Sequence, residues 1–202
     1  MTRLKITLTL VAGFLLNGTV GRAANPDSLQ ARIVVTAIAY DDGFGSALKS
    51  PAGIWCDPIS GELYVADAGN GRVVIYDRYL SCNFSFLHYV RDPQSGRQVL
   101  GEPKALAVNH QGEMLLIDGR TDVLDLLDFR GHLLNQCRPN KLLGDTTLKV
   151  RATCVTLGDR DLFYLLVTGD LTRILVIDGD LKLVHQMGEK GELPGQFDSP
   201  TA

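Results

Sequence analysis

The chain has 202 residues, of which 45% are hydrophobic and 21% charged, and its formal net charge is −3. This composition excludes wholesale disorder, because enough apolar residues are present to form a core. The slight acidity argues against a nucleic-acid partner, since such partners are held by basic surfaces.

The first 23 residues have the layout of a secretory signal peptide. Arg3 and Lys5 precede an uncharged stretch from residue 6 to 20, and small residues lead up to Ala23. The stretch is shorter than the ~20 residues that a spanning helix needs. An uncleaved membrane anchor is the alternative. We expect cleavage after Ala23, a mature chain without a membrane span, and a periplasmic or extracellular location.

The four cysteines all lie beyond this segment and leave two readings open. An oxidising compartment permits two disulfides, in any of three pairings. Alternatively, the cysteines are buried as small hydrophobic residues. The sequence contains no Cys-x-x-Cys, which argues against a zinc knuckle, a redox motif and a haem attachment site. These cysteines are Cys56, Cys82, Cys137 and Cys154.

A repeat of about fifty residues organises the rest of the chain. Aspartates align the copies at spacings of 51 and 50 residues: Asp67 with Asp118, and Asp77 with Asp128 and Asp178. Each copy contains four short runs rich in Val, Ile, Leu and Tyr, bounded by Gly, Asp, Asn and Pro, which predict β-strands. Four strands in each repeat are typical of a β-propeller blade.

The predicted strands are 54–56, 63–66, 73–76 and 84–90 in the first copy, 105–108, 114–117, 123–129 and 132–136 in the second, and 153–157, 162–167, 173–177 and 181–187 in the third. The fold class is therefore all-β, a partial propeller of about three four-stranded blades and the start of a fourth.

One motif carries a family resemblance. The segment from Pro51 to Val73 reads Pro-x-Gly-Ile-x-x-Asp-Pro-x-x-Gly-x-Leu-Tyr-Val-Ala-Asp-x-Gly-Asn-Gly-Arg-Val and resembles an NHL repeat. The second copy departs from it at 121–123, and the third has Thr168 in the place of Asp67. Residues 188–200 resemble the linker into a further repeat. The resemblance covers roughly residues 30–202 and implies a six-bladed propeller.

The domain prediction is a signal peptide at 1–23 and an incomplete NHL-like propeller at 24–202, with blades at 48–99, 100–147 and 148–196 and the next blade starting at 197–202. Six blades need about 300 residues. We therefore expect an N-terminal part of a longer propeller, with self-association as the alternative means of closure. An open arc would expose two apolar blade faces. The alternating segment 32–38 predicts one further strand.

The aspartates that recur with the repeat have two interpretations. They could surround a metal ion, as in propeller hydrolases. A repeated position instead predicts a repeated structural role, in which carboxylates bind backbone N–H groups in turns, and this is the reading we favour. The histidines at 88, 132 and 185 fall on or near outer strands, which argues against zinc. We expect no metal and no cofactor. The residues concerned are Asp57, Asp67, Asp77, Asn109, Asp118, Asp128 and Asp178.

The functional prediction is an exported, non-catalytic propeller module that binds a protein or other extracellular ligand through loops on a rigid scaffold. These loops are 68–71, 119–122 and 169–172. The alternative is the N-terminal part of a metal-dependent, lactonase-like hydrolase or lyase, with an active site partly in further blades. Arg72 and Arg173 share one repeat position, where a structural use is favoured. The candidate binding residues are Asn70, Arg72, Arg120, Asp122, Asp170 and Arg173.

Overall fold

The computed structural model describes residues 37–92 and 94–200. The chain divides into two compact units, residues 1–39 and 40–202, and every strand described below belongs to the second. The predicted signal peptide lies outside the described residues, as does most of the strand predicted at 32–38. In the part that the structure describes, no helix is long and apolar enough to cross a membrane.

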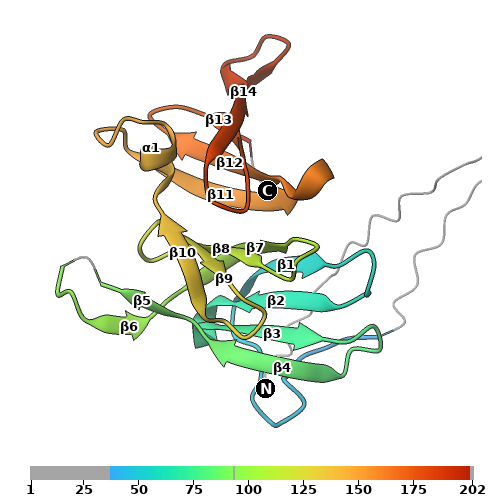
Figure 1. Ribbon diagram of the computed structural model, residues 1–202. Helices are drawn as coiled ribbons and strands as arrows, with labels where there is room; N and C mark the ends of the chain where they lie inside the picture. Colours follow the sequence, from blue (N-terminus) through green and yellow to red (C-terminus); the bar gives the residue numbers. More distant parts are fainter. Residues whose placement is uncertain (1–36, 93, 201–202) are drawn as a thin grey trace, which may run out of the picture. The chain divides into compact units, whose positions relative to one another are not determined.

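Three four-stranded antiparallel sheets follow one another along the chain, and the strands within each sheet pair in sequence order (Figure 1). The all-β class and the twelve blade strands predicted from the sequence are confirmed. The strands are β1 (Pro51–Cys56), β2 (Leu63–Asp67), β3 (Arg72–Tyr76) and β4 (Cys82–Leu87) in the first sheet, β7 (Pro103–Val108), β8 (Met114–Asp118), β9 (Leu124–Leu127) and β10 (Leu133–Cys137) in the second, and β11 (Val150–Leu157), β12 (Phe163–Gly169), β13 (Arg173–Ile177) and β14 (Leu183–Met187) in the third.

The recurring aspartates hold the hairpins, as the structural reading predicted. After β3, one carboxylate oxygen of Asp77 accepts the backbone N–H groups of residues 79 and 81, both at 2.8 Å. Asp128 and Asp178 accept the equivalent pairs after β9 and β13. Asn109 does the same after β7 through its amide oxygen. These side chains satisfy turn N–H groups that would otherwise depend on water.

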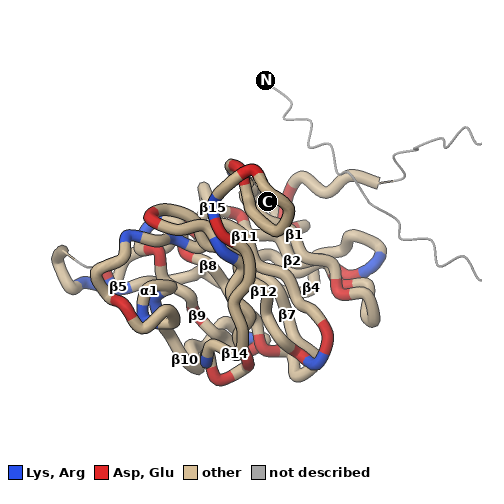
Figure 2. Tube along the Cα trace, turned by 90° about the horizontal axis from the view of Figure 1, so that it is seen from above, with Lys and Arg blue, Asp and Glu red and all other residues tan. Residues whose placement is uncertain are grey.

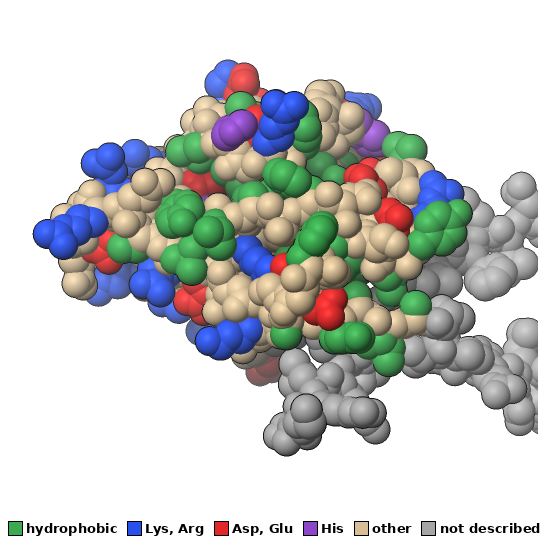
Figure 3. Space-filling view, turned by 90° about the horizontal axis from the view of Figure 1, so that it is seen from below, with side chains coloured by type: hydrophobic (Ala, Val, Ile, Leu, Met, Phe, Trp, Pro, Cys, Tyr) green, Lys and Arg blue, Asp and Glu red, His purple; other side chains and the backbone are tan. Residues whose placement is uncertain are grey.

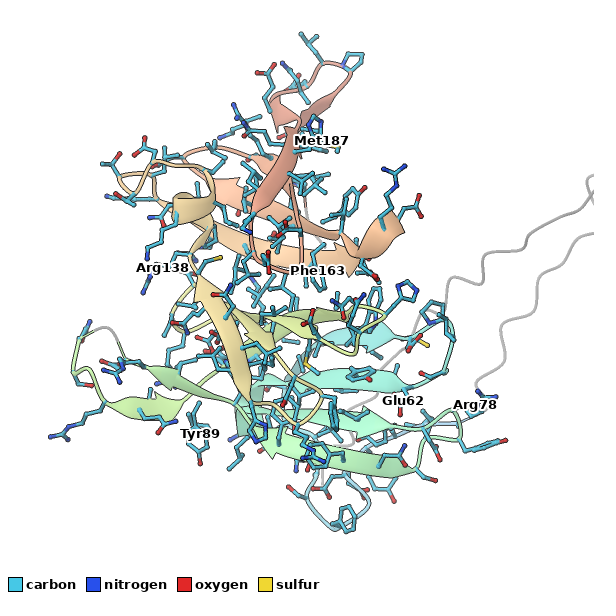
Figure 4. All side chains as sticks on the ribbon, in the orientation of Figure 1. Glu62, Arg78, Tyr89, Arg138, Phe163 and Met187 are labelled. Carbon is cyan, nitrogen blue, oxygen red and sulfur yellow. The ribbon has the colours of Figure 1, made fainter. Side chains whose placement is uncertain are left out.

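The innermost strands of neighbouring sheets pack against each other, β1 on β7 and β7 on β11. They come so close that a Cβ at Gly53 would lie 2.5 Å from the carbonyl oxygen of Lys104. Two apolar cores fill the spaces between the sheets. The second and third sheets share a core that includes Phe163, which is fully buried (Figure 4). Trp55 packs against both cores.

One blade face departs from the expectation for an open arc. On the side of the first sheet that faces away from the second, Val65, Val74 and Tyr76 are buried rather than exposed. The Tyr76 hydroxyl also donates a 2.6 Å hydrogen bond to the carbonyl oxygen of Asp41. On the far side of the third sheet, Tyr164 and Leu166 are half-buried. The predicted apolar exposure is therefore wrong for the first sheet.

The connections between sheets contain elements that the sequence pattern did not predict. The strand expected at 84–90 ends at Leu87, and a second hairpin follows, formed by β5 (Tyr89–Arg91) and β6 (Gln98–Leu100). A one-turn helix, α1 (Pro139–Leu142), precedes the third sheet. After β14, two-residue strands β15 (Glu189–Lys190) and β16 (Gln196–Phe197) pair in parallel. Short 3-10 turns occupy Ala68–Asn70 and Asp159–Asp161.

The four cysteines are free thiols. Cys56 is exposed and the other three are half-buried. Burial raises the pKa of Cys137 to about 11, which keeps this thiol protonated and unreactive near neutral pH. The structure therefore has neither a disulfide among these four residues nor the full burial that the alternative reading expected.

Candidate functional site

The antiparallel order of the strands gives the second unit two different ends. The β2–β3, β8–β9 and β12–β13 turns lie at the same end as the connections between sheets, residues 88–102 and 138–149; we call this the connection face. The remaining hairpin turns form the opposite hairpin face. Figure 4 shows Tyr89 and Arg138 on the first side and Glu62 and Arg78 on the second. All three predicted binding loops therefore lie on the connection face.

A cavity of about 430 Å³ opens on the connection face between the first and second sheets. We call it the groove. It is lined by Ala68, Gly69 and Gly71 of the β2–β3 turn, by Ser50 and Ala52 at the start of β1, by Leu100–Glu102, and by Arg120. Most of these residues are small, so main-chain atoms are accessible to a ligand. Arg120 and Glu102 are exposed and place one positive and one negative charge at its rim.

Asp67 fixes the wall of the groove that belongs to the first sheet. Its fully buried carboxylate accepts the backbone N–H of Lys49 at 2.6 Å, the Asn70 amide at 2.7 Å and the Nε of Arg72 at 2.7 Å. A second nitrogen of Arg72 lies 2.6 Å from the carboxylate of Asp42. Burial alone would lower the pKa of Arg72, but its bonds to the two aspartates raise it. The guanidinium is therefore a permanent charge between two carboxylates.

Asp118 fixes the opposite wall in a related way. It accepts the backbone N–H groups of Glu102 at 2.6 Å, Arg120 at 3.1 Å and Thr121 at 2.8 Å, as well as the Thr121 hydroxyl at 2.7 Å. Burial would raise the pKa of Asp118, but these bonds and its contact with His88 outweigh burial and lower it to about 2. Two residues that line the groove thus depend on one buried carboxylate.

Glycine is required where the two walls meet. A Cβ at Gly71, which has φ +60°, would lie 2.3 Å from Cγ of Leu100. A Cβ at Gly101 would lie 2.5 Å from Cδ2 of His88 and 2.6 Å from Oδ2 of Asp118. Because any side chain at either position would collide with packed atoms, the groove depends on these glycines for its depth.

Among the six predicted binding residues, Arg120 lines the groove. Asn70 and Arg72 come close to it, but their side chains bond within the chain and hold the segment 42–49. Asp122 is half-buried with φ +54°, and its carboxylate lies 3.9 Å from Nε of Arg151 at the start of β11. Ligand contact by any of them stays a prediction.

The remaining two candidates belong to the third blade. The Asp170 carboxylate accepts the backbone N–H of Lys149 at 2.8 Å, the role that Asp67 has for Lys49. Arg173 donates a 2.7 Å hydrogen bond to Gln186 and makes no ion pair with a described residue. Neither lines the groove. Sequence reasoning did not select the groove residues 50–52 and 100–102, although both stretches flank the prolines that start β1 and β7.

Within residues 37–92 and 94–200, no three His, Cys, Asp or Glu side chains are arranged to hold a metal ion. The histidines have separate environments. His110 bonds to Asp161 and so links the β7–β8 and β11–β12 turns on the hairpin face. His132 bonds to Asp128 at 2.8 Å. His88, by contrast, is 3% exposed and lies below the groove.

Comparison with known proteins supports the fold. No family model and no curated protein sequence matches the chain. The solved structures that resemble it include hydrazine synthase from Kuenenia stuttgartiensis, with 17% identity and a TM-score of 0.51 over 80% of this chain and 40% of that one. Others are the Dos1 propeller (13%, 0.47, 69% and 34%) and a nidogen–laminin complex (16%, 0.45, 69% and 49%).

At these identities the similarity shows the fold alone. The chain spans less than half the length of each of these structures. The three four-stranded antiparallel sheets, packed against one another through their innermost strands, make the protein a partial β-propeller. The similarity to NHL repeats still depends on the motif between Pro51 and Val73.

Proposed function

We propose that this chain is a non-catalytic β-propeller module that binds a protein or another extracellular ligand on its connection face. The groove between the first and second blades is the observation that supports the proposal. There, two predicted binding loops and a connection between blades border one open cavity of about 430 Å³. Both of its walls are fixed by buried aspartates, so it exists before a ligand arrives.

The lining favours a polypeptide segment over a nucleic acid. Small residues let a ligand's main chain approach the main chain of the groove. Arg120 and Glu102 at the rim can meet an anionic and a cationic group of the same ligand. Among the described residues that line the groove, none is aromatic, so none offers a ring on which a base could stack.

Two further predictions belong to this proposal. We propose that the protein is exported, on the layout of residues 1–23, and that its blades are NHL-like, on the motif of the first blade. Export would bring the groove into contact with periplasmic or extracellular partners. The export prediction is tested by the mass of the mature protein recovered from outside the cytoplasm.

Site-specific photo-crosslinking tests the groove. A photoreactive residue replaces Ala52, which lines the groove, in the full chain expressed in its native host. The control position is Thr156, which is exposed on β11 and lies outside the groove. We expect crosslinked partner from position 52 but not from 156. Arg120→Glu should reduce the crosslinking several-fold, whereas Arg130→Glu on the hairpin face should not.

Two results would argue against the proposal. Equal crosslinking from positions 52 and 156 would mean that contact is nonspecific, and an unchanged yield in Arg120→Glu would remove the groove from the binding surface. Metal-dependent turnover of a lactone by the purified chain, retained in Arg120→Glu, would instead favour the alternative of a propeller hydrolase.

A further inference from the structure

The first two blades each place one basic side chain between two buried carboxylates. In the first blade, Arg72 lies between Asp67, at the end of β2, and Asp42, in the segment that precedes β1. All three residues are at most 7% exposed. The arginine thereby holds the entry segment of the blade against the turn that follows β2.

In the second blade the arginine is absent, because Val123 occupies the position of Arg72. A histidine from the connection takes the place between the carboxylates. Nε2 of His88 lies 3.4 Å from Oδ2 of Asp118 and 3.5 Å from Oδ2 of Asp125. This nitrogen is buried and has no well-directed hydrogen bond. Asp125 occupies the repeat position that Val74 occupies in the first blade. The second blade therefore has both a histidine and an additional carboxylate at this place.

The surroundings leave His88 as the charge partner of both carboxylates. Among the described residues, no Lys or Arg comes within ion-pair distance of Asp118 or Asp125. From β10, Asp125 receives only the neutral amide of Gln136, at 2.6 Å. Above the ring, Arg120 and Glu102 are exposed and direct only their backbone N–H groups to Asp118. Two buried carboxylates facing a neutral ring would be costly.

The main chain around His88 connects this cluster to the groove. The N–H of His88 donates to the carbonyl of Gly71, and the N–H of Gly101 donates to the carbonyl of His88, both at 2.8 Å. Gly71, Gly101 and Glu102 all line the groove. A change in the charge of His88 would therefore act on both walls.

We propose that His88 is a buried imidazolium that does for the second blade what Arg72 does for the first, and that loss of its proton loosens residues 88–102 and the groove. The effect on a ligand rests on the proposed function. The charge state and the loosening do not, and they are measured without a ligand, so they can fail or succeed independently of the crosslinking test.

NMR on the full chain tests the charge state. His185 is exposed and serves as the reference histidine. Because His88 lies between two buried carboxylates, we expect its ring to stay doubly protonated to a higher pH than the ring of His185 does. Deprotonation of His88 together with His185 would overturn the proposal.

Amide hydrogen exchange tests the loosening. The N–H of Glu102 bonds to Asp118, and the N–H of Lys49 bonds to Asp67 in the arginine-held first blade. After correction for the intrinsic exchange rate, protection of Glu102 should fall at least about tenfold as His88 loses its proton, while Lys49 keeps its protection. The same pH profile for both amides would refute the proposal.

Two variants separate charge from packing. His88→Gln retains a hydrogen-bonding side chain but cannot become cationic, so Glu102 should exchange rapidly at every pH. The double variant His88→Ala/Val123→Arg places a permanent cation at the repeat position of Arg72, and Glu102 should then be protected without dependence on pH. Retained pH dependence in either variant would overturn the assignment. If a variant does not fold, the measurements on the natural chain decide.

Discussion

Replacing Arg72 by methionine tests how strongly the buried ion cluster holds the first blade. The substitution keeps an apolar side chain but leaves two carboxylates, Asp67 and Asp42, without their cation at 2.7 and 2.6 Å. Removing one partner of a buried ion pair typically costs ~3–5 kcal/mol. Arg173→Met is the matched control, because Arg173 occupies the same repeat position but makes one hydrogen bond, to Gln186. Loss of this hydrogen bond should lower the free energy of unfolding by ~1 kcal/mol or less.

The free energy of unfolding in urea measures both effects on the full chain. The single tryptophan, Trp55, lies on β1 against both cores, so its fluorescence reports on the affected blade. We expect the urea concentration at the midpoint of unfolding to fall far more for Arg72→Met than for Arg173→Met. A loss below about 1 kcal/mol for Arg72→Met would show that water replaces the guanidinium, and the account of the first blade would then be wrong.

Other predictions concern the wall formed by Asp118. Gly101→Ala should destabilise the chain by ~1–3 kcal/mol, because its Cβ would lie 2.5 Å from Cδ2 of His88. Gly119→Ala is the control and should be close to neutral, because the nearest atom to its Cβ would be 3.4 Å away. Thermal melts of the two variants compare these effects. The pKa of Asp118 is about 2, below its ordinary value of 3.8. The ionised carboxylate therefore contributes about 2 kcal/mol to the free energy of unfolding above pH 4, and this contribution is lost as the pH falls toward 2. In Asp118→Asn, the free energy of unfolding should fall less steeply between pH 4 and pH 2 than in the natural chain. The same pH dependence in both proteins would contradict this prediction.

The strands could be predicted because each one is a short apolar run between turn residues. Asp77, Asp128 and Asp178 lie in the equivalent hairpin of each blade. Each accepts hydrogen bonds from backbone N–H groups of that hairpin, which explains why aspartate recurs at this position. The break after Leu87 could not be predicted, since the residues on both sides of His88 continue the strand pattern. Burial against the next blade, a tertiary contact, ends β4 there.

The candidate site was predicted in part. Placing the binding loops on one face follows from antiparallel strand order, and this brought Arg120 to the groove. The residues contributed by connections, such as Ser50 and Glu102, carry no composition signal, because small and charged residues are ordinary in loops. Asn70 and Arg72 were both named as candidate ligand contacts, although a structural use was favoured for Arg72; in the structure, both side chains bond to the entry segment of their own blade.

The three blades hold their entry segments by different means. The first uses a buried guanidinium between Asp67 and Asp42, and the second an imidazole between Asp118 and Asp125.

The third blade has no buried ion pair among the described residues; there the exposed Asp170 carboxylate accepts the backbone N–H of Lys149, and Leu142 and Leu143 of the entry segment pack on the core. Buried charges require fixed partners, so the first two blades have rigid turns and tightly bound connections on the connection face. Figure 2 shows charged residues near β5, in the connection that enters the second blade, and near α1, in the connection that enters the third.

In the view of Figure 3, the surface hydrophobic side chains form separate small groups with polar surface between them. Among the described residues visible in that view, no continuous apolar patch is offered to a partner. A rigid polar groove above two buried charge clusters is the better-formed binding surface, and its second cluster makes pH the variable that should control it.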